Sequence, residues 1–589
     1  MCVSSNVKAF LGMLFACGVQ AAHIPDNAAI GLAADKDSYF LGENILLHYC
    51  ITNVGDKALP VDMGGDYRGG TRAERFKVHA FDAQGLLLTD PHPQQWNMGG
   101  LLSRRDLKPG EVWYGNVVLC RYRKFERPGK YRIEVFHDLG WGNRQDKDVR
   151  VKMIELTVKE PNAEDAKTVI AHMRKMLSYG GNSFGKKGQA AADFSLLTHP
   201  VYRDALEEIG DVHSVKSISG MPGIGSTKSL LRLMRRPDEI ASAWAGYAIA
   251  RRIPPSYGEA PMHGVGSSFW PHRRPPEIRD AWQSGFGKEA RAIALDMLAR
   301  TNTHSKVSAA GILMQVGNRD DLNALITAMD EVFLLVGQPV PKADRYSHPK
   351  WALQQLHKAL EQFAKRGVTF IRAPQTPAEH LARIADGFVN TNASNINWVP
   401  VVQSALTHPE AVVREISVRR VPQGVGYAVL PDVITLMADP DDAVRRAACE
   451  IVNNGKHLGC REYALEAIRT STDNWTIWMA TDAAVRDGGR AECGRALADR
   501  FAAMADHPQY ASMHVMRHLC RILVGGNMSG SWHFLRQPDG KAKAAAIRDA
   551  WKKLIEEHAG ELENGVLPLG KKALPPELVP PGVNYRPAN

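Results

Sequence analysis

The chain has 589 residues, of which 44% are hydrophobic and 23% are charged. A chain of this composition buries enough apolar surface to fold, which excludes wholesale disorder, and its length exceeds one compact core, so about two to four regions are expected. The formal net charge of +10 is mild for this length and only slightly favours acidic surfaces or polyanionic glycans as partners.

The N-terminal segment, 1–21, is predicted to be a signal peptide. A positive charge precedes a short apolar run, 9–19, which has about half the length that spans a bilayer. Val19 and Ala21 place small or apolar side chains at the two positions that a signal peptidase reads. Cleavage is therefore expected between Ala21 and Ala22.

An alternative is that Cys17 is processed and lipid-anchored, because residues 14–17 resemble a lipobox, although the bulky Phe15 argues against it. Either process exports the chain, so we expect it to be periplasmic or extracellular. No other run approaches the ~18 apolar residues of a membrane span, and no transmembrane segment is expected in the mature chain.

The cysteines after residue 21 leave two alternatives open. An exported chain meets an oxidising compartment, where these cysteines could pair, but the connectivity cannot be deduced from the sequence; single buried thiols are the other reading. The absence of a Cys-x-x-Cys pair argues against a zinc ribbon or a thioredoxin-like redox site. The six positions are Cys50, Cys120, Cys449, Cys460, Cys493 and Cys520.

The segment 28–158 has the pattern of short strands separated by turns. Strands are expected at 44–52, 76–81, 112–120, 131–136 and 149–158. Lys108-Pro-Gly-Glu111 and Arg127-Pro-Gly-Lys130 are Pro-Gly turns. Short strands at such spacing favour an antiparallel β-sandwich. The layout resembles bacterial immunoglobulin-like domains and, more loosely, bacterial proteinase-inhibitor sandwiches.

After Pro161 the apolar residues recur with a helical period, and 163–557 is predicted to be a helical array. Helices are expected at 163–177, 290–300, 307–316, 322–335, 351–364, 377–384, 463–468, 475–485, 490–504, 507–523 and 544–557. The tail, 558–589, is rich in proline. It either packs on the last helices as an extended peptide or forms a loose end.

The clearest helix pair spans 430–452, and a similar unit lies 31 residues upstream. The matched positions are Pro400 with Pro431, Pro409 with Pro440, and Val413-Arg414 with Val444-Arg445. Repetition at such a period indicates stacked helix pairs that bury a continuous core. The turn and second helix, 439–448, resemble a HEAT repeat. That resemblance implies a right-handed α-solenoid whose concave face binds partners, and it implies no catalytic residue.

A proline-rich insertion, 253–286, interrupts the array. Its prolines exclude helix over most of its length, and a loop longer than ~15 residues inside a compact array is usually functional or disordered. Trp270, Arg273, Arg274 and Trp282 cluster in this insertion. Aromatic and arginine side chains are the usual anchors of interfaces, so these four are the candidate binding residues. Alternatively, the tryptophans fill a groove of their own array.

Consecutive arginines occur three times on the expected helices, as Arg251-Arg252, Arg419-Arg420 and Arg445-Arg446. They are expected to form a solvated face or a ladder of ion pairs with acids of neighbouring repeats. The alternative is a basic stripe that faces a ligand.

Motifs that would indicate chemistry fail on spacing. Gly220–Ser229 is glycine-rich, but Ser226 stands where a phosphate loop needs lysine, so a turn between repeats is expected. His514 and His518 lie one helical turn apart and could begin a metal site, but no Glu follows the first, and core-lining or solvent-facing histidines are expected. No Gly-x-Ser-x-Gly elbow is present. No catalytic residue, metal or cofactor is therefore expected.

These features predict a multidomain α+β protein, with an immunoglobulin-like β-sandwich before a HEAT-like α-solenoid. The expected function is that of an exported, non-enzymatic scaffold that binds a protein partner. One alternative is a glycan- or envelope-binding module that acts through the sandwich or the Trp/Arg loop. Another is an uncharacterised hydrolase with its site on the insertion. No nucleic-acid partner is expected.

Overall fold

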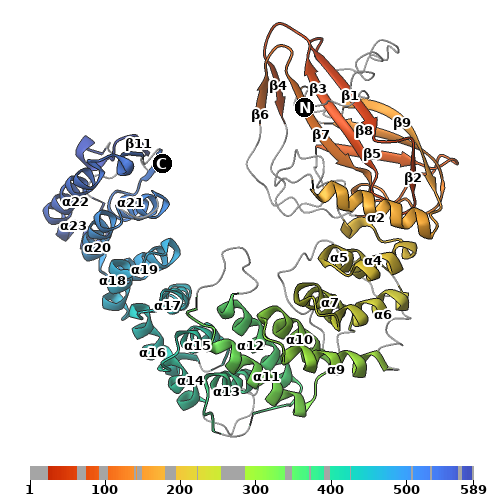
Figure 1. Ribbon diagram of the computed structural model, residues 1–589. Coiled ribbons are helices and arrows are strands. Elements are labelled where there is room, and N and C mark those ends of the chain that lie inside the picture. Colours follow the sequence, from red (N-terminus) through yellow and green to blue (C-terminus); the bar gives the residue numbers. More distant parts are fainter. Residues whose placement is uncertain are drawn as a thin grey trace. The chain divides into compact units, whose positions relative to one another are not determined.

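The computed structural model describes residues 24–62, 75–91, 104–137, 141, 149–178, 194–221, 223–253, 285–338, 348–370, 373–389, 398–424, 426–505, 509–530, 533–567 and 574–586. These residues belong to two compact units, which meet in the sequence between Val316 and Gly317. The first unit combines β-sheets with helices, and the second is mainly helical, so the chain is an α+β protein (Figure 1).

The strands of the first unit form two main sheets. The three-stranded antiparallel sheet has the order β1-β3-β7 and consists of β1 (Ala28–Ala34), β3 (Leu46–Asn53) and β7 (Val112–Val118). The four-stranded sheet has the order β2-β9-β8-β5 and consists of β2 (Ser38–Phe40), β9 (Val149–Lys159), β8 (Gly129–His137) and β5 (Phe76–Phe81). A separate antiparallel pair joins β4 (Leu59–Asp62) to β6 (Arg104–Leu107). The strands expected from the sequence correspond to β3, β5, β7, β8 and β9.

Side chains from both main sheets share one hydrophobic core. In β3 the alternating residues Leu47, Tyr49 and Ile51 are each 0% exposed. They belong to the same buried cluster as Val78 of β5 and Ile133 of β8. A strand places every second side chain on one face, so this alternation is what gives each sheet a buried side.

A buried histidine lies within this core. The hydroxyl of Tyr49 is 2.9 Å from Nδ1 of His137, and the His137 ring stacks on Phe76 with centroids 4.0 Å apart. Burial, with a smaller effect of Arg75, lowers the pKa of His137 to about 3. This imidazole is therefore a neutral core residue at physiological pH.

The β-sheets of the first unit contact its first helices directly. The hydroxyl of Tyr202 donates to the carbonyl of Leu41 at 3.1 Å in a buried bond. Gly42 follows with φ of +80°, and a Cβ there would lie 2.6 Å from Cβ of His199. Only glycine combines this backbone conformation with so close an approach.

The helices of the first unit include two short series. After α2 (Ala163–Ser178), one series comprises α4 (Arg203–Ile209), α6 (Gly223–Met234) and α9 (Gly287–Leu298). The other comprises α5 (Val212–Gly220), α7 (Glu239–Arg252) and α10 (Thr303–Val316). Each helix packs on the next member of its own series, and the two series pack on each other. We call them the first and second layers of this unit.

The second unit repeats the two-layer arrangement (Figure 1). Its first layer comprises α11 (Arg319–Phe333), α13 (Pro377–Val389), α14 (Val399–Leu406), α16 (Leu430–Thr435), α18 (Arg461–Thr470), α20 (Arg490–Ala503) and α22 (Gly540–Glu557). Its second layer comprises α12 (Pro349–Lys365), α15 (Ala411–Gly424), α17 (Asp442–Asn454), α19 (Asn474–Arg486) and α21 (Gln509–Val524). From α15 onward, each second-layer helix packs on the next.

The described part of the tail packs on the last helices. Strand β11 (Val583–Arg586) pairs antiparallel with β10 (Asn527–Gly530). The indole of Trp551 in α22 donates to the carbonyl of Leu578 at 3.0 Å. Leu578 and Val583 belong to the same hydrophobic cluster as α18 to α22. The extended-peptide alternative therefore holds for 574–586, whereas the predicted tail begins with a short helix, α23 (Ala559–Glu563).

Asparagine and aspartate side chains begin several of the helices. Each accepts a backbone N–H of the first turn, which satisfies donors that have no partner inside the helix. These caps are Asp211, Asp238, Asn318, Asp441 and Asp473. Among the described residues, no helix has both the length and the apolar character needed to cross a membrane.

Candidate functional site

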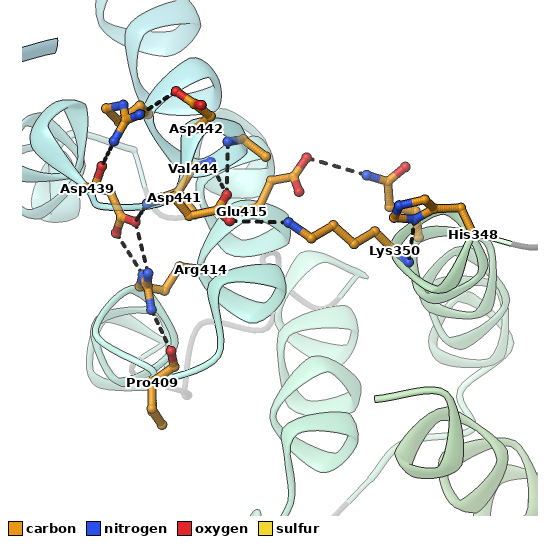
Figure 2. A network of polar contacts seen from close by, with 12 residues as sticks. His348, Lys350, Pro409, Arg414, Glu415, Asp439, Asp441, Asp442 and Val444 are labelled. Atoms are coloured by element: carbon orange, nitrogen blue, oxygen red, sulfur yellow. Dashed lines mark hydrogen bonds and ion pairs between the residues drawn. The ribbon is translucent and has the colours of Figure 1, made fainter. Parts of the chain in front are cut away.

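The second layer of the second unit carries a connected series of polar side chains (Figure 2). Nζ of Lys350, in the first turn of α12, lies 3.2 Å from the carboxylate of Asp441, which caps α17. One helical turn further along α12, Gln354 contacts Glu415 of α15 at 3.4 Å. These contacts connect three helices that are far apart in sequence.

The charge of Asp441 depends on these neighbours. Burial alone would raise its pKa, but the Lys350 ammonium and the amides of Val444 and Ala443 outweigh burial, and the pKa of Asp441 lies below its ordinary value. The carboxylate is thus held in its charged form, in which it both caps a helix and pairs with lysine.

A nearly buried ion pair fixes the turn before α17. Arg414 of α15 donates from Nε and Nη2 to the two carboxylate oxygens of Asp439, at 2.8 and 2.9 Å. The side chains are 12% and 4% exposed. Nη1 of Arg414 also donates to the carbonyl of Pro409 at 2.8 Å (Figure 2). The same nitrogen donates to the carbonyl of His408 at 2.7 Å. One guanidinium therefore joins two consecutive interhelical turns.

The matched positions of the sequence repeat have matching contacts. Arg414 donates to the carbonyl of His408, and Arg445 donates to the carbonyl of Asp439. Donors and acceptors are both displaced by the same 31 residues that separate the sequence units. The repeated arginine thus holds the turn that precedes its own helix.

Arginines and acids then alternate across α15, α17 and α19. Arg419 lies 3.1 Å from Glu415 on its own helix and 3.0 Å from Glu450 on α17. Arg446 lies 3.4 Å from Glu450 and 3.9 Å from Asp473, the cap of α19. The predicted ladder of arginine–acid pairs is therefore confirmed on these helices.

The other arginines of the predicted pairs differ in environment. Arg420 pairs with Glu361 of α12. Arg252 is only 8% exposed in the first unit and contradicts the expectation of a solvated or acid-paired residue. It donates to the hydroxyls of Ser226 and Thr227, both at 2.8 Å, and to three backbone carbonyls. Burial lowers the pKa of Arg252 to about 10.

An exposed tryptophan stands beside the ladder. Trp475 of α19 is 37% exposed, and Cζ of Arg446 lies 5.9 Å from its ring centroid. The ring of Trp478 meets it at 81°, with centroids 4.7 Å apart. Exposed tryptophan and arginine together are typical of binding surfaces. We define the candidate site as this face of α15, α17 and α19.

This site differs from the one expected from sequence. Trp270, Arg273, Arg274 and Trp282 lie outside the described residues, as do Ala21 and Ala22 at the expected cleavage site. Trp475 and Trp478 were not among the expected binding residues. The available signal was a Trp-x-x-Trp spacing, which places both rings on one helical face.

The glycine-rich segment Gly220–Ser229 forms no phosphate loop. It follows α5, a helix and not a strand, and α6 begins at Gly223, so the expected turn is limited to its first residues. Ser226 is buried and donates to the carbonyl of Met221. The segment instead begins a helix that packs against Arg252.

The histidine pair of α21 has a structural environment. Nε2 of His518 lies 3.3 Å from Oδ1 of Asn474 in α19. Burial is the main cause that lowers the pKa of His518 to about 4, and burial also lowers the pKa of His514. In the described parts of the chain, no three His, Cys, Asp or Glu side chains converge in a group that could hold a metal ion.

All six cysteines after the predicted signal peptide are free thiols. Cys449, Cys460, Cys493 and Cys520 are buried within the helices of the second unit. Burial raises the pKa of Cys493 to about 12. The alternative of single buried thiols therefore holds for these four cysteines, whereas Cys50 and Cys120 are half-buried free thiols.

Histidine–proline steps form a recurrent cap. Nδ1 of His199 accepts from the amide of Val201 at 3.4 Å, and Nδ1 of His348 accepts from Lys350 at 3.3 Å. In both cases the proline that follows occupies the first helical position, where no N–H is needed. Nδ1 of His408 accepts from Glu410 at 3.0 Å in the turn that precedes α15.

Comparison with known proteins identifies no relative for this arrangement. No protein-family model and no curated protein matches the chain. A Listeria innocua beta-glucosidase in complex with glucose is 15% identical and has a TM-score of 0.13, over 22% of this chain and 16% of that chain. Escherichia coli alpha-2-macroglobulin is 11% identical over 90% of this chain and has a TM-score of 0.14. A mutant Salmonella alpha-2-macroglobulin is 12% identical over 92% of this chain and also has a TM-score of 0.14. The match covers only 26% and 27% of the two macroglobulin chains. Structural similarity with such low TM-scores supports no conclusion about the fold or function of this chain.

Proposed function

We propose that this protein is an exported, non-enzymatic scaffold that binds a protein partner through the second layer of its helices. In this proposal an immunoglobulin-like β-sandwich precedes a right-handed HEAT-like α-solenoid. The observation that carries the proposal is the face of α15, α17 and α19, where a ladder of ion pairs lies beside the exposed Trp475. Proteins built from stacked helix pairs use such extended faces for binding.

Three features support the architecture. The two main sheets of the first unit bury side chains in one shared cluster. Successive helices of the second unit pack in two layers. The arginine contacts at Arg414 and Arg445 repeat at the spacing of the sequence units. A repeated side-chain contact is stronger support for a repeat than matched sequence alone, because it places the same interaction at the same step of the array.

The proposed location rests on the N-terminal sequence. Mass spectrometry of the protein recovered from its producing cells should find Ala22 as the first residue. A diacylated N-terminus at Cys17 would instead make the scaffold lipid-anchored. Detection of the intact Met1 N-terminus in all of the protein would refute export by this segment.

Site-specific photo-crosslinking tests the binding face. A photoreactive residue placed at Arg419, whose side chain is 40% exposed in the second layer, should capture a defined protein. The matched control is Arg469, which is 54% exposed on α18 in the first layer. Equal capture at both positions, or capture of polysaccharide at Arg419, would refute a protein-binding second layer.

A further inference from the structure

The two units contain the same aromatic arrangement, although they share no sequence repeat there. In the first unit, Nζ of Lys216 on α5 lies 5.8 Å from the ring centroid of Trp244 on α7. In the second unit, Cζ of Arg446 on α17 lies 5.9 Å from that of Trp475 on α19. In both cases the cation and the tryptophan come from consecutive helices of the second layer.

The likeness extends to a second aromatic ring. Trp244 is followed three residues later by Tyr247, with centroids 6.0 Å apart and the ring planes at 77°. Trp475 is followed three residues later by Trp478, at 4.7 Å and 81°. Residues three apart lie on one face of a helix, so each pair forms a corner of two nearly perpendicular rings. We call each corner with its cation an aromatic–cation cluster.

Both clusters reach the surface. Trp475 is 37% exposed, and the side chain of Arg446 is 44% exposed. In the first unit Lys216 is exposed, Trp244 is partly buried and Tyr247 is only 6% exposed at the base. Tryptophan gains much by being covered, so a half-covered tryptophan beside a cation is suited to a partner that completes its burial.

The cation of the second cluster, Arg446, is available to an anion. Arg446 lies 3.4 Å from Glu450 and 3.9 Å from Asp473, whereas a direct charge-assisted bond is about 2.7–2.9 Å long. Its present pairs are therefore loose, and exposed pairs of this kind contribute little stability. The net charge of the chain, +10, also favours acidic partners.

The ring geometry distinguishes between kinds of partner. A sugar ring covers the flat face of one aromatic ring. Two rings at nearly 80° instead present the face of one ring and the edge of the other, which suits a bulky apolar side chain better than a flat sugar ring. With a cation at the rim, the complementary group is an apolar side chain flanked by carboxylates.

We propose that the two aromatic–cation clusters are two copies of one binding site for an acidic peptide segment that carries a bulky apolar anchor. This inference rests on the proposed protein-binding function and specifies the chemistry of the partner. A partner that presents the segment more than once gains avidity from having a site in each unit, provided its linker allows both to engage.

Isothermal titration with a short synthetic peptide, glutamates around a single phenylalanine, tests this inference on the full mature chain. Two clusters predict two peptides per chain. Trp475→Ala should remove one of the two, and Lys216→Gln and Arg446→Gln should each weaken one site by about tenfold. A peptide with alanine in place of phenylalanine should bind at least about tenfold more weakly.

The controls are matched in exposure and lie in the first layers. Tyr463→Ala on α18 removes an aromatic ring that is also 37% exposed, and Lys228→Gln on α6 removes an exposed lysine. Both variants should bind like the natural chain. The charge variants Lys216→Gln and Arg446→Gln change surface side chains only, so a change in their binding does not depend on unfolding.

The outcomes separate this inference from the proposed function. Peptide binding that is absent, or is unchanged in Trp475→Ala, Arg446→Gln and Lys216→Gln, overturns the inference. If a crosslinked protein partner at Arg419 still binds Trp475→Ala normally, the scaffold function stands and the inference fails. In a third outcome, the peptide does not bind, whereas polygalacturonate binds and loses affinity in these variants. The inference and the proposed protein-binding function then both fail, because the site recognises an acidic glycan.

Discussion

Each unit holds an arginine that is buried or nearly buried, but the two arginines have different partners. Among the described residues, Arg252 in the first unit donates only to hydroxyls and carbonyls, whereas Arg414 in the second unit also pairs with the carboxylate of Asp439. Burial lowers the pKa of Arg252 to about 10, and hydrogen bonding to Asp439 raises the pKa of Arg414. The same side chain is therefore held by neutral dipoles in one unit and by a charge in the other.

The difference shows what an interhelical turn needs from arginine. Both guanidiniums bind backbone carbonyls of a turn, Met221 in the first unit and His408 in the second. The carboxylate is thus not required for this role. What both sites use is a rigid fork of donors, which lysine cannot supply. The two sites should consequently respond differently when an acceptor or the arginine itself is removed.

The largest loss of stability is expected from a change in the core of the second unit, which tests whether its helices unfold together. Val444 is 0% exposed in α17, one turn from the Arg414–Asp439 pair. Val444→Asp buries an unpaired carboxylate and should destabilise the unit by more than about 4 kcal/mol, measured by urea denaturation. In stacked repeats the loss should extend to neighbouring helices.

Ala443→Asp is the matched control, because Ala443 is partly exposed on the same turn and an acid near a helix N-terminus is favourable. It should leave the unfolding midpoint nearly unchanged. If Val444→Asp unfolds at the natural urea concentration, Val444 does not belong to a continuous core.

The paired arginine is tested by removing its acid. Asp439→Ala leaves the guanidinium of Arg414 nearly buried without its carboxylate and should cost about 3 kcal/mol. The double variant Asp439→Ala with Arg414→Met should recover part of this loss, because no charge is then left without a partner. Urea denaturation of Asp439→Ala, Arg414→Met and the double variant completes the cycle with the natural chain. If Asp439→Ala and the double variant have the same free energy of unfolding, removal of the unpaired guanidinium brings no gain. Arg414 and Asp439 are then not energetically coupled.

The unpaired arginine should be less costly to remove. Arg252→Met leaves carbonyls such as that of Met221 without a donor and should cost about 2 kcal/mol, read from thermal unfolding of the first unit. Arg252→Lys keeps a charge but loses the fork, so it should restore little of that stability. Full recovery by lysine would show that charge alone, and not the fork, matters at this site.

The elements that could be predicted are those in which hydrophobic residues recur with the period of a strand or a helix. The alternation in Leu46–Asn53 and Phe76–Phe81 marks strands because each has one buried face. Ala28–Ala34 is not predicted as a strand, since its run of alanine and glycine has little strand preference and pairs with β3 only through the tertiary fold. Gly220–Ser229 is predicted to be a turn, because its glycines hide the start of α6, which Arg252 stabilises from another helix.

The candidate site was less predictable than the fold. The arginine ladder followed from consecutive arginines on helices, because each helix has neighbours that supply acids. The cluster at Trp475 depends on Arg446, which is distant in sequence and reaches it only when α17 and α19 pack together. Spacing within one helix can suggest a pair of rings, but it cannot supply the cation from another helix.

The smallest expected effect concerns a histidine that caps a turn beside the paired arginine. Nδ1 of His408 accepts the amide of Glu410 at 3.0 Å, so protonation at this nitrogen would remove the cap. Burial is the main cause that lowers the pKa of His408, and the charges of His380 and Arg414 lower it further. The ring centroids of His380 and His408 lie 4.9 Å apart, and the pKa of His380 is itself lowered mainly by burial. The unfolded chain therefore binds these protons more readily than the folded chain.

Stability from His408 is consequently present above its unfolded pKa of 6.5 and is lost as the pH falls from there through the lower folded pKa. The cap is worth about 1 kcal/mol, and urea midpoints at about pH 7.5 and about pH 5 should differ accordingly. His408→Asn keeps a capping side chain that does not titrate, so it should show a smaller loss over the same interval. Histidines other than His380 contribute equally to both proteins, so the difference between the two reports on residue 408 together with its contact to His380. An identical loss in the variant would mean that the cap persists on the protonated ring or contributes nothing, and the turn would then be held by Arg414 alone.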